Sequence, residues 1–288
     1  MKPLDIISAI CVIGLWAGNF VAAKYMLNYW PPFFMSAIRF GVVAVLLLPF
    51  AKIPYGAFKK IFYLSFTLGI LHFGLIMVGL KGLDASTSTI AVQAGVPFSV
   101  LLASIVLKEK LYAHQIVGIC ISFIGFLVLV GEPQIFSRLG PFLIVVAAAF
   151  FWAIANLQSR GLKDISGFTL NAWFALFTMP ELLLVSFVTE DGQMEGLLEA
   201  DLTTYFCLMY TVVMSTIVAY GMWYRLLSKY PVTQVAPFNM LSPFFGALFG
   251  VLFYNESMTW LKIIGAVVIV AGVSVLVFYK PKSSKIKT

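Results

Sequence analysis

The chain has 288 residues, of which 61% are apolar, 16% aromatic and only 11% charged, with a mean hydropathy of +0.98. Soluble domains carry about 25% charged and about 45–50% apolar residues, and a soluble monomer cannot hide such an excess of apolar surface from water. The composition excludes a soluble enzyme, a nucleic-acid-binding module and a disordered chain. It predicts an integral membrane protein.

Ten apolar runs are long enough to cross the bilayer as helices, which requires about 20 residues. In chain order they are 5–26, 31–50, 61–80, 85–107, 112–131, 139–159, 167–188, 203–225, 232–254 and 260–279. The runs are continuous rather than alternating, which favours helices over an outer-membrane barrel. The first run is a span and not a cleaved signal, because Asn19 and Lys24 stand where a cleavage site would be expected. The sequence thus predicts an all-α membrane protein with ten transmembrane helices.

Basic residues predict the orientation of these helices. With the amino terminus inside, 14 of the 19 Lys and Arg residues fall in the inner segments. The loop at 189–202 contains five acidic residues and no basic one. We therefore expect both termini in the cytoplasm. The net charge of +7 is a signal of topology and not of nucleic-acid binding.

An internal repeat divides the chain into residues 1–134 and 135–288. The matching residues are Pro97, Glu109, Gly118 and Gly125 in the first half and Pro243, Glu256, Gly265 and Gly272 in the second. Each half holds five spans, an odd number, so the second half must enter the membrane from the opposite side. Inverted repeats around a midplane site are typical of secondary transporters. The two glutamates lie at helix corners, where we expect local caps or ion pairs, with gating as the alternative.

Four features carry a family signature. Residues 16–20 read Trp-x-x-Asn-Phe, residues 38–40 read Ile-Arg-Phe, and residues 219–227 form an aromatic segment; the doubled Pro, Glu and Gly pattern is the fourth. Together they resemble the EamA family of the drug/metabolite transporter superfamily, over nearly the whole chain. Segments between 208 and 237 look closest to its O-acetylserine/cysteine exporter branch. This resemblance implies a secondary carrier in a bacterial inner membrane that exports small metabolites, often amino acids.

Two amides stand one helical turn before the prolines of the repeat. A helix proline has no N–H and clashes with the carbonyl four residues earlier, which belongs to Gln93 before Pro97 and to Asn239 before Pro243. Each half thus offers a freed carbonyl and an amide side chain near the midplane, where carriers contact polar substrates. In the alternative, the prolines shape packing and the amides bond across helices.

A second symmetric amide pair follows two tryptophans. Asn19 and Asn156 lie three and four residues after Trp16 and Trp152. They are candidates for lining the same cavity, with the tryptophans as apolar walls, and ordinary interhelical hydrogen bonding is the alternative. Tyr220 and the aromatics three and four residues after it share one helix face, which suits a cavity wall or a seam between helices.

Three ionisable side chains lie well inside spans, where a charge usually faces protein or a water-filled cavity. Arg39 either holds a substrate carboxylate or forms a fixed clamp with a carbonyl or with Glu181. His72 either carries a coupling proton or is a neutral histidine bonded to a neighbouring helix. Glu181 either takes up protons or faces the headgroups.

The sequence contains no ATP-binding loop and no hydrolase or dinucleotide motif, so we expect neither an enzyme nor a cofactor. Two histidines are too few for a metal site, and the three cysteines are expected to be buried thiols. The expected partners are a small-molecule substrate and the lipid bilayer, without nucleic acid. The Gly-x-x-x-Gly faces at 14–18 and 246–250 allow a monomer or a homodimer. Uptake in place of export, and a non-transporting membrane scaffold or enzyme subunit, are the alternative functions.

Overall fold

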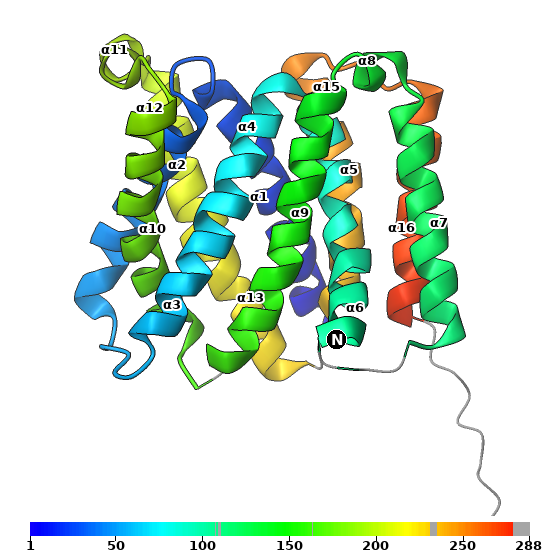
Figure 1. Cartoon of the computed structure of the whole chain (residues 1–288), viewed down its shortest axis with the longest axis horizontal. Helices are drawn as coiled ribbons and strands as arrows, with labels where there is room; N and C mark the ends of the chain where they lie inside the picture. The colour runs from blue at the N-terminus through cyan, green and yellow to red at the C-terminus, as the bar shows by residue number, and fades with distance from the viewer. Residues whose placement is uncertain (107, 109–110, 163, 231–234, 279–288) are drawn as a thin grey trace, which may run out of the picture.

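The computed structural model describes residues 1–106, 108, 111–162, 164–230 and 235–278, and within them the protein forms helices without any strand. The helices run side by side between two ends of one bundle (Figure 1). The amino terminus and the last helix, α16 (Trp260–Phe278), reach the same end, at the bottom of Figure 1. The opposite end carries α8 (Pro133–Phe136) and α11 (Gln193–Glu199) and is called the α8 end below.

The first half of the chain contains three simple spans and two composite ones. The elements are α1 (Pro3–Met26), α2 (Pro32–Leu47), η1 (Leu48–Phe50), α3 (Phe58–Leu64), η2 (Ser65–Gly74), α4 (Leu75–Gly82), α5 (Ala85–Ala91), η3 (Val92–Ala94), α6 (Gly95–Val106) and α7 (Ala113–Val130). The segments α3, η2 and α4 form one continuous membrane-length helix, and α5, η3 and α6 form another.

The second half of the chain also contains simple and composite helices. Its elements are α9 (Leu139–Ser159), η4 (Arg160–Leu162), α10 (Gly167–Thr189), α12 (Leu202–Met209), η5 (Tyr210–Val218), α13 (Ala219–Lys229), η6 (Ala236–Leu241) and α15 (Ser242–Tyr254), followed by α16. In the described part of the chain, eight helices are long and apolar enough to cross a membrane. The apolar helical stretches Phe238–Tyr254 and Trp260–Val275 are shorter.

Two kinds of helix irregularity each occur twice. The segments η2 and η5 are π-helical, and η3 and η6 are 3₁₀-helical. The 3₁₀ segments lie just before Pro97 and Pro243, which cannot donate to the carbonyls four residues earlier. At the second site the N–H of Ser242 donates to the Asn239 carbonyl, the shorter bond that a 3₁₀ turn provides.

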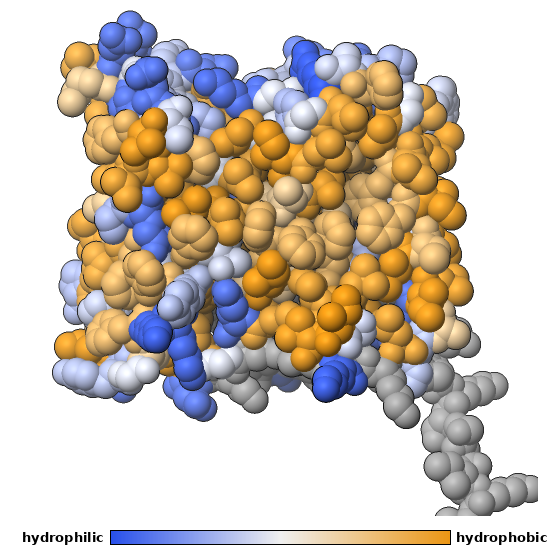
Figure 2. All heavy atoms as spheres, in the orientation of Figure 1, coloured by the Kyte–Doolittle hydropathy of each residue, from blue (hydrophilic) through white to orange (hydrophobic). Residues whose placement is uncertain are grey.

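The surface of the bundle is that of a membrane protein. Apolar side chains cover the middle of the face shown in Figure 2, and hydrophilic residues gather toward the two ends. Large apolar side chains on the outside of the helices are widely exposed, among them Phe187 at 69% and Leu127 at 71%. Such an apolar belt is suited to contact with lipid. Lipid offers no hydrogen bonds, and the helices satisfy their backbone polar groups internally.

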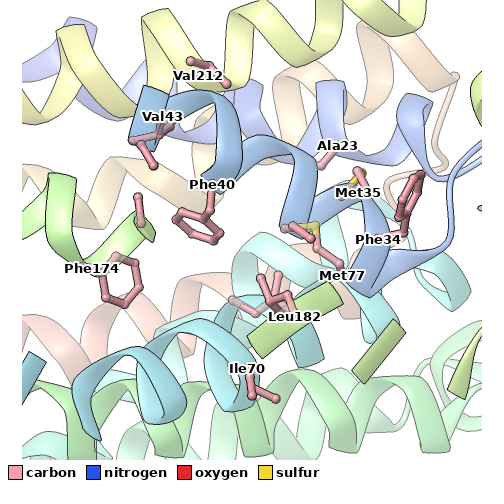
Figure 3. Close-up of a cluster of buried hydrophobic side chains, with 14 of the residues drawn as sticks. Ala23, Phe34, Met35, Phe40, Val43, Ile70, Met77, Phe174, Leu182 and Val212 are labelled. Atoms are coloured by element: carbon pink, nitrogen blue, oxygen red, sulfur yellow. The ribbon is translucent and has the colours of Figure 1, made fainter. Parts of the chain in front are cut away.

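The interior is held by close packing of α2, η2 and α10 (Figure 3). The Phe40 ring lies 5.3 Å from that of Phe73 and 5.4 Å from that of Phe174, measured between centroids. A Cβ built on Gly69 would lie 2.5 Å from the Thr178 side chain. Because lipid removes the hydrophobic drive between helices, such small-residue contacts stabilise the assembly.

The helices α7 and α16 pack backbone to backbone through the glycines of the repeat. A Cβ on Gly125 would lie 3.0 Å from the carbonyl oxygen of Gly265, and one on Gly272 would lie 2.7 Å from that of Gly118. Neither position has room for a side chain. These contacts explain why glycine recurs at matching places in the two halves.

Both Gly-x-x-x-Gly faces pack within this chain. Cβ atoms built on Gly246 and Gly250 would meet Thr89 and Ser86 of α5. On α1, Gly14 faces the Phe245 ring, and Gly18 lies against the hydroxyl of Tyr210.

The expectation of buried thiols is wrong for two of the three cysteines. Cys11 and Cys120 are exposed on the outside of the bundle, and Cys207 is partly buried. Their helices turn these positions toward lipid, which accepts a thiol as readily as a protein core does.

Glu109, expected at a helix corner, lies outside the described residues.

Candidate functional site

The two predicted amides before the prolines meet where η3 and η6 approach each other. Gln93 is 8% exposed, and its Nε2 donates a 3.4 Å hydrogen bond to the backbone oxygen of Asn239. Pro243 has no N–H and therefore cannot donate a hydrogen bond to that carbonyl oxygen. The contact is long for a hydrogen bond, so a polar ligand could replace it at little cost.

Arg39 is buried, and no ion pair to it is present among the described residues. Its Nη2 donates to the Thr216 hydroxyl at 2.9 Å, and that hydroxyl donates to the Thr211 carbonyl at 2.8 Å. The guanidinium lies 5.6 and 5.8 Å from the ring centroids of Phe40 and Phe73. Nε has no partner in the described part of the chain. The guanidinium therefore has an unused hydrogen-bond donor at Nε.

Trp16 forms an aromatic cluster beside this arginine. Its indole Nε1 donates to the carbonyl of Ser215 at 3.1 Å, the residue before the partner of Arg39. Its ring lies 5.1 Å from that of Tyr220 and 5.2 Å from that of Trp223. This is a seam between α1 and α13, one of the two arrangements expected from the aromatic spacing.

The second amide pair is less regular. Asn19 is 8% exposed, and its Oδ1 has no partner among the described residues. Asn156 is partly buried in α9. Trp152 packs over Gly95, where a Cβ would lie 2.7 Å from the indole ring. Trp152 therefore packs against the helix that follows Gln93, whereas the ring contacts of Trp16 are to α13.

His72 and Glu181 lie in separate surroundings. His72 is buried, and its Nδ1 lies 2.9 Å from the Ala148 carbonyl, so that nitrogen carries the proton. Glu181 accepts from the Ser65 hydroxyl at 2.8 Å, while its Oε2 has no partner within the described ranges. The structure does not bring Glu181 to Arg39, so the clamp expected as one alternative is not formed between them.

Residues that the sequence analysis missed complete these surroundings. Thr216 and Ser215 belong to the π-helix η5, and Ser65 begins the π-helix η2. The sequence signal that could have found them is the presence of small hydroxyl residues inside apolar spans. Only the π-helical turn settles which of them face inward, and π-bulges often occur at functional sites.

The two halves interlock at the α8 end. The Glu256 carboxylate accepts from the backbone N–H groups of Ala85 at 2.6 Å and Ser86 at 3.0 Å, and from the Ser86 hydroxyl. The expectation that Glu256 acts within its own corner is therefore wrong: it caps a helix of the other half. A carboxylate is favoured there by the unpaired amides of a helix start.

Two further contacts belong to the same interlock. Lys262 is 0% exposed, and its Nζ lies 2.5 Å from the Asp84 carboxylate. Thr259 donates to Glu132 at 2.5 Å. Every contact joins a residue of the first half to one of the second. At the opposite end, Asp5 lies 3.4 Å from Lys229 Nζ.

The cavities on the surface of the described residues include three with volumes of about 270, 350 and 330 Å³. The first, at the α8 end, has Asp84 and Arg138 among its lining residues. The second is an apolar groove between α2 and α10, and the third lies beside Lys24 and Lys81. None of these three is lined by Gln93 or Asn239. At their contact Gln93 is buried and Asn239 is partly buried.

Similar proteins define the class. The model of the EamA-like transporter family matches residues 4–131 and 138–278. Two relatives named "Probable amino-acid metabolite efflux pump", from Escherichia coli (strain K12) and Salmonella typhimurium (strain LT2), are each 30% identical over 288 residues, with 96% of both chains covered. An "Uncharacterized transporter" of Archaeoglobus fulgidus is 25% identical over 271 residues, covering 90% of this chain and 92% of that one.

A solved crystal structure has a TM-score of 0.63 to this protein at 16% identity, covering 96% of this chain and 98% of that one. The likeness in fold therefore extends over the whole chain. The family match and the names of these relatives indicate a transporter rather than an enzyme. The chain belongs to the EamA-like transporter family of multi-pass membrane proteins.

Proposed function

We propose that this protein is a secondary transporter that exports small polar metabolites of the amino-acid class across a bacterial inner membrane. The observation that carries the proposal is its 30% identity, over 96% of each chain, to two proteins named as probable amino-acid metabolite efflux pumps. Flux is driven by the substrate gradient or by protons, in keeping with the lack of an ATP-binding loop in the sequence.

The transport mechanism we propose is alternating access by two inverted repeats, 1–134 and 135–288. The packing of α7 on α16 supports it. The repeat pairs Gly118 with Gly265 and Gly125 with Gly272. If each glycine is replaced by its match in the other half, the observed contact of Gly125 with Gly265 becomes the observed contact of Gly272 with Gly118. Reciprocal contacts of this kind are expected when a two-fold axis relates the two halves.

Packing between the other helices supports the same axis. The π-helix η2 packs on α9, and the π-helix η5 packs on α1. Similarly, α6 packs on α9 and α15 packs on α1. Exchanging the two halves converts each of these contacts into its partner. With Phe238–Tyr254 and Trp260–Val275 as short ninth and tenth spans, each half contributes five helices.

The α8 end is the periplasmic end in this proposal, and both termini are cytoplasmic. The acidic loop at 189–202 lies at the α8 end, and the amino terminus and α16 end at the other. The interlock of Glu256 with Ala85 and Ser86 then closes the outer face. Export requires these contacts to open.

The substrate site we propose lies between the halves at Gln93 and Asn239, with Arg39 supplying positive charge. Arg39 is a buried cation with an unused donor at Nε. A substrate carboxylate would satisfy both the charge and the donor. Trp16, Trp152 and Tyr220 supply apolar walls, and Asn19 and Asn156 supply further amides. His72 and Glu181 are the groups available for proton coupling.

The test is uptake of labelled L-cysteine and O-acetyl-L-serine into proteoliposomes, with and without an imposed pH gradient. We expect saturable uptake of at least one compound by the folded, inserted protein. Acceleration by the gradient would show proton coupling, for which His72 and Glu181 are the candidate groups. Absence of saturable flux for a broad amino-acid panel would refute the proposed substrate class.

A further inference from the structure

The cavity of about 270 Å³ at the α8 end lies beside the interlock and is separate from the proposed central site. Its walls come from the start of α5 and from the segment around α8, with Asp84 and Thr87 on one side and Gln134, Ser137 and Arg138 on the other. Leu83 and Ile135 supply the apolar part of the lining. Its volume is below the about 300–1,000 Å³ of cavities for drug-sized ligands, so it suits one small metabolite.

Opposite charges face each other across this cavity. The Asp84 side chain is 26% exposed although Lys262 holds one of its oxygens. Arg138 is exposed, and among the described residues its guanidinium makes a single hydrogen bond, 3.4 Å to the Gly82 carbonyl. Arg138 can pair with a carboxylate, and the partly exposed Asp84 can pair with an ammonium beside Lys262. The pair suits a ligand that carries both charges.

An unsatisfied hydroxyl gives a second, independent observation. Thr87 is 1% exposed, and its Oγ1 has no hydrogen-bond partner within the described ranges. A buried polar atom without a partner is unfavourable and is satisfied when a ligand brings one. The neighbouring hydroxyl of Ser137 and amide of Gln134 add polar groups that can donate or accept hydrogen bonds.

We propose that this cavity is an outer binding site for a zwitterionic α-amino acid, which pairs its ammonium with Asp84 and its carboxylate with Arg138. The inference rests on the proposed function for its substrate class and its outward orientation. The site lies against the contacts that close the outer face, because Asp84 also binds Lys262. A substrate released outward is therefore held next to the interlock before it leaves.

The variants that test this site are chosen to leave the fold intact. R138Q removes an exposed charge with one long hydrogen bond, and T87V removes a hydroxyl that has no partner. Asp84 is left in place because it neutralises the buried Lys262. The matched control is K81Q, which removes a positive charge from an exposed residue on a different cavity.

Equilibrium binding of labelled L-serine is measured in lipid nanodiscs, in a Q93A/N239A background that lacks the proposed central site. We expect one remaining site per chain. R138Q should weaken binding about tenfold, as loss of a charge-assisted hydrogen bond does. T87V should weaken it severalfold, and K81Q should leave it unchanged. N-acetyl-L-serine and L-serine methyl ester, which each lack one charge, should not compete.

No binding in the background variant, or equal effects of R138Q and K81Q, would overturn the outer site. If the background variant does not insert, the wild type must show two sites, of which one weakens about tenfold in R138Q and neither weakens in K81Q. Flux separates this inference from the proposed function. Saturable transport without outer binding refutes the outer site alone, and outer binding without transport refutes the transport function alone.

Discussion

A cation at the centre of a membrane costs about 2.5–3.5 kcal/mol on insertion scales, so a buried arginine needs compensation. Arg39 receives part of it from the Thr216 hydroxyl and from the rings of Phe40 and Phe73. The rest is missing, because Nε has no acceptor among the described residues. A substrate carboxylate that binds Nε would supply the missing compensation.

Replacing Arg39 by Gln separates structure from function at this position. We expect R39Q to retain at least wild-type thermal stability, since it no longer buries a cation, and to lose saturable transport of carboxylate-bearing substrates. Thermal unfolding in detergent and proteoliposome flux measure the two effects. Wild-type transport kinetics in R39Q would remove Arg39 from the substrate site.

The Lys262–Asp84 pair makes a prediction of the opposite kind. Removing one partner of a buried ion pair leaves an unpaired charge and costs about 3–5 kcal/mol. D84N should therefore lower the unfolding temperature strongly, because Lys262 is fully buried. The double variant D84N/K262M should recover most of the loss. Equal unfolding temperatures for D84N and the wild type would show that the pair contributes nothing to stability.

At the scale of elements, irregularity and small residues determine how the helices meet. The Asn239 carbonyl, to which Pro243 cannot donate, accepts from the N–H of Ser242 and from Gln93 Nε2. The π-helices were not predictable, since residues 65–74 and 210–218 have ordinary apolar composition. Their turns rotate Thr216 and Ser65 toward their partners, and sequence spacing based on 3.6 residues per turn cannot show that rotation.

The glycine contacts of α7 and α16 predict a position-specific cost. G272A would place a methyl group 2.7 Å from a backbone oxygen, and overpacking of this kind costs about 1–3 kcal/mol. The control is G140A, whose Cβ would meet nothing within 4 Å. We expect a lower unfolding temperature for G272A only. Equal temperatures for the two variants would refute the close approach of these helices.

The cap of α12 predicts a pH dependence. Hydrogen bonds from the Tyr25 hydroxyl, at 2.7 Å, and from Thr204 hold the pKa of Asp201 below its ordinary value. The charged cap thus stabilises the fold above the ordinary pKa of aspartate, and this stabilisation is lost as the pH falls through the lowered pKa. D201A should lower the unfolding temperature at neutral pH but not in strong acid. A difference independent of pH would contradict this assignment.

At the scale of the whole molecule, composition was sufficient to predict the helical membrane architecture, and motifs were sufficient to predict the family. The inverted repeat and the count of ten spans remain predictions, supported by the reciprocal glycine contacts. The interlock could not be predicted, because Glu256 caps a helix that starts 171 residues earlier. Spacing along the chain indicates which residues match, whereas contacts between matching halves depend on how the bundle closes.

The central claim is that substrate passes between the halves at Gln93 and Asn239, and saturable flux through the double variant Q93A/N239A tests it most directly. The matched control is N28A, which removes an exposed amide far from that contact along the chain. The account predicts that Q93A/N239A inserts and unfolds like the wild type but loses saturable transport, while N28A transports normally. Unchanged transport kinetics in Q93A/N239A would contradict the account.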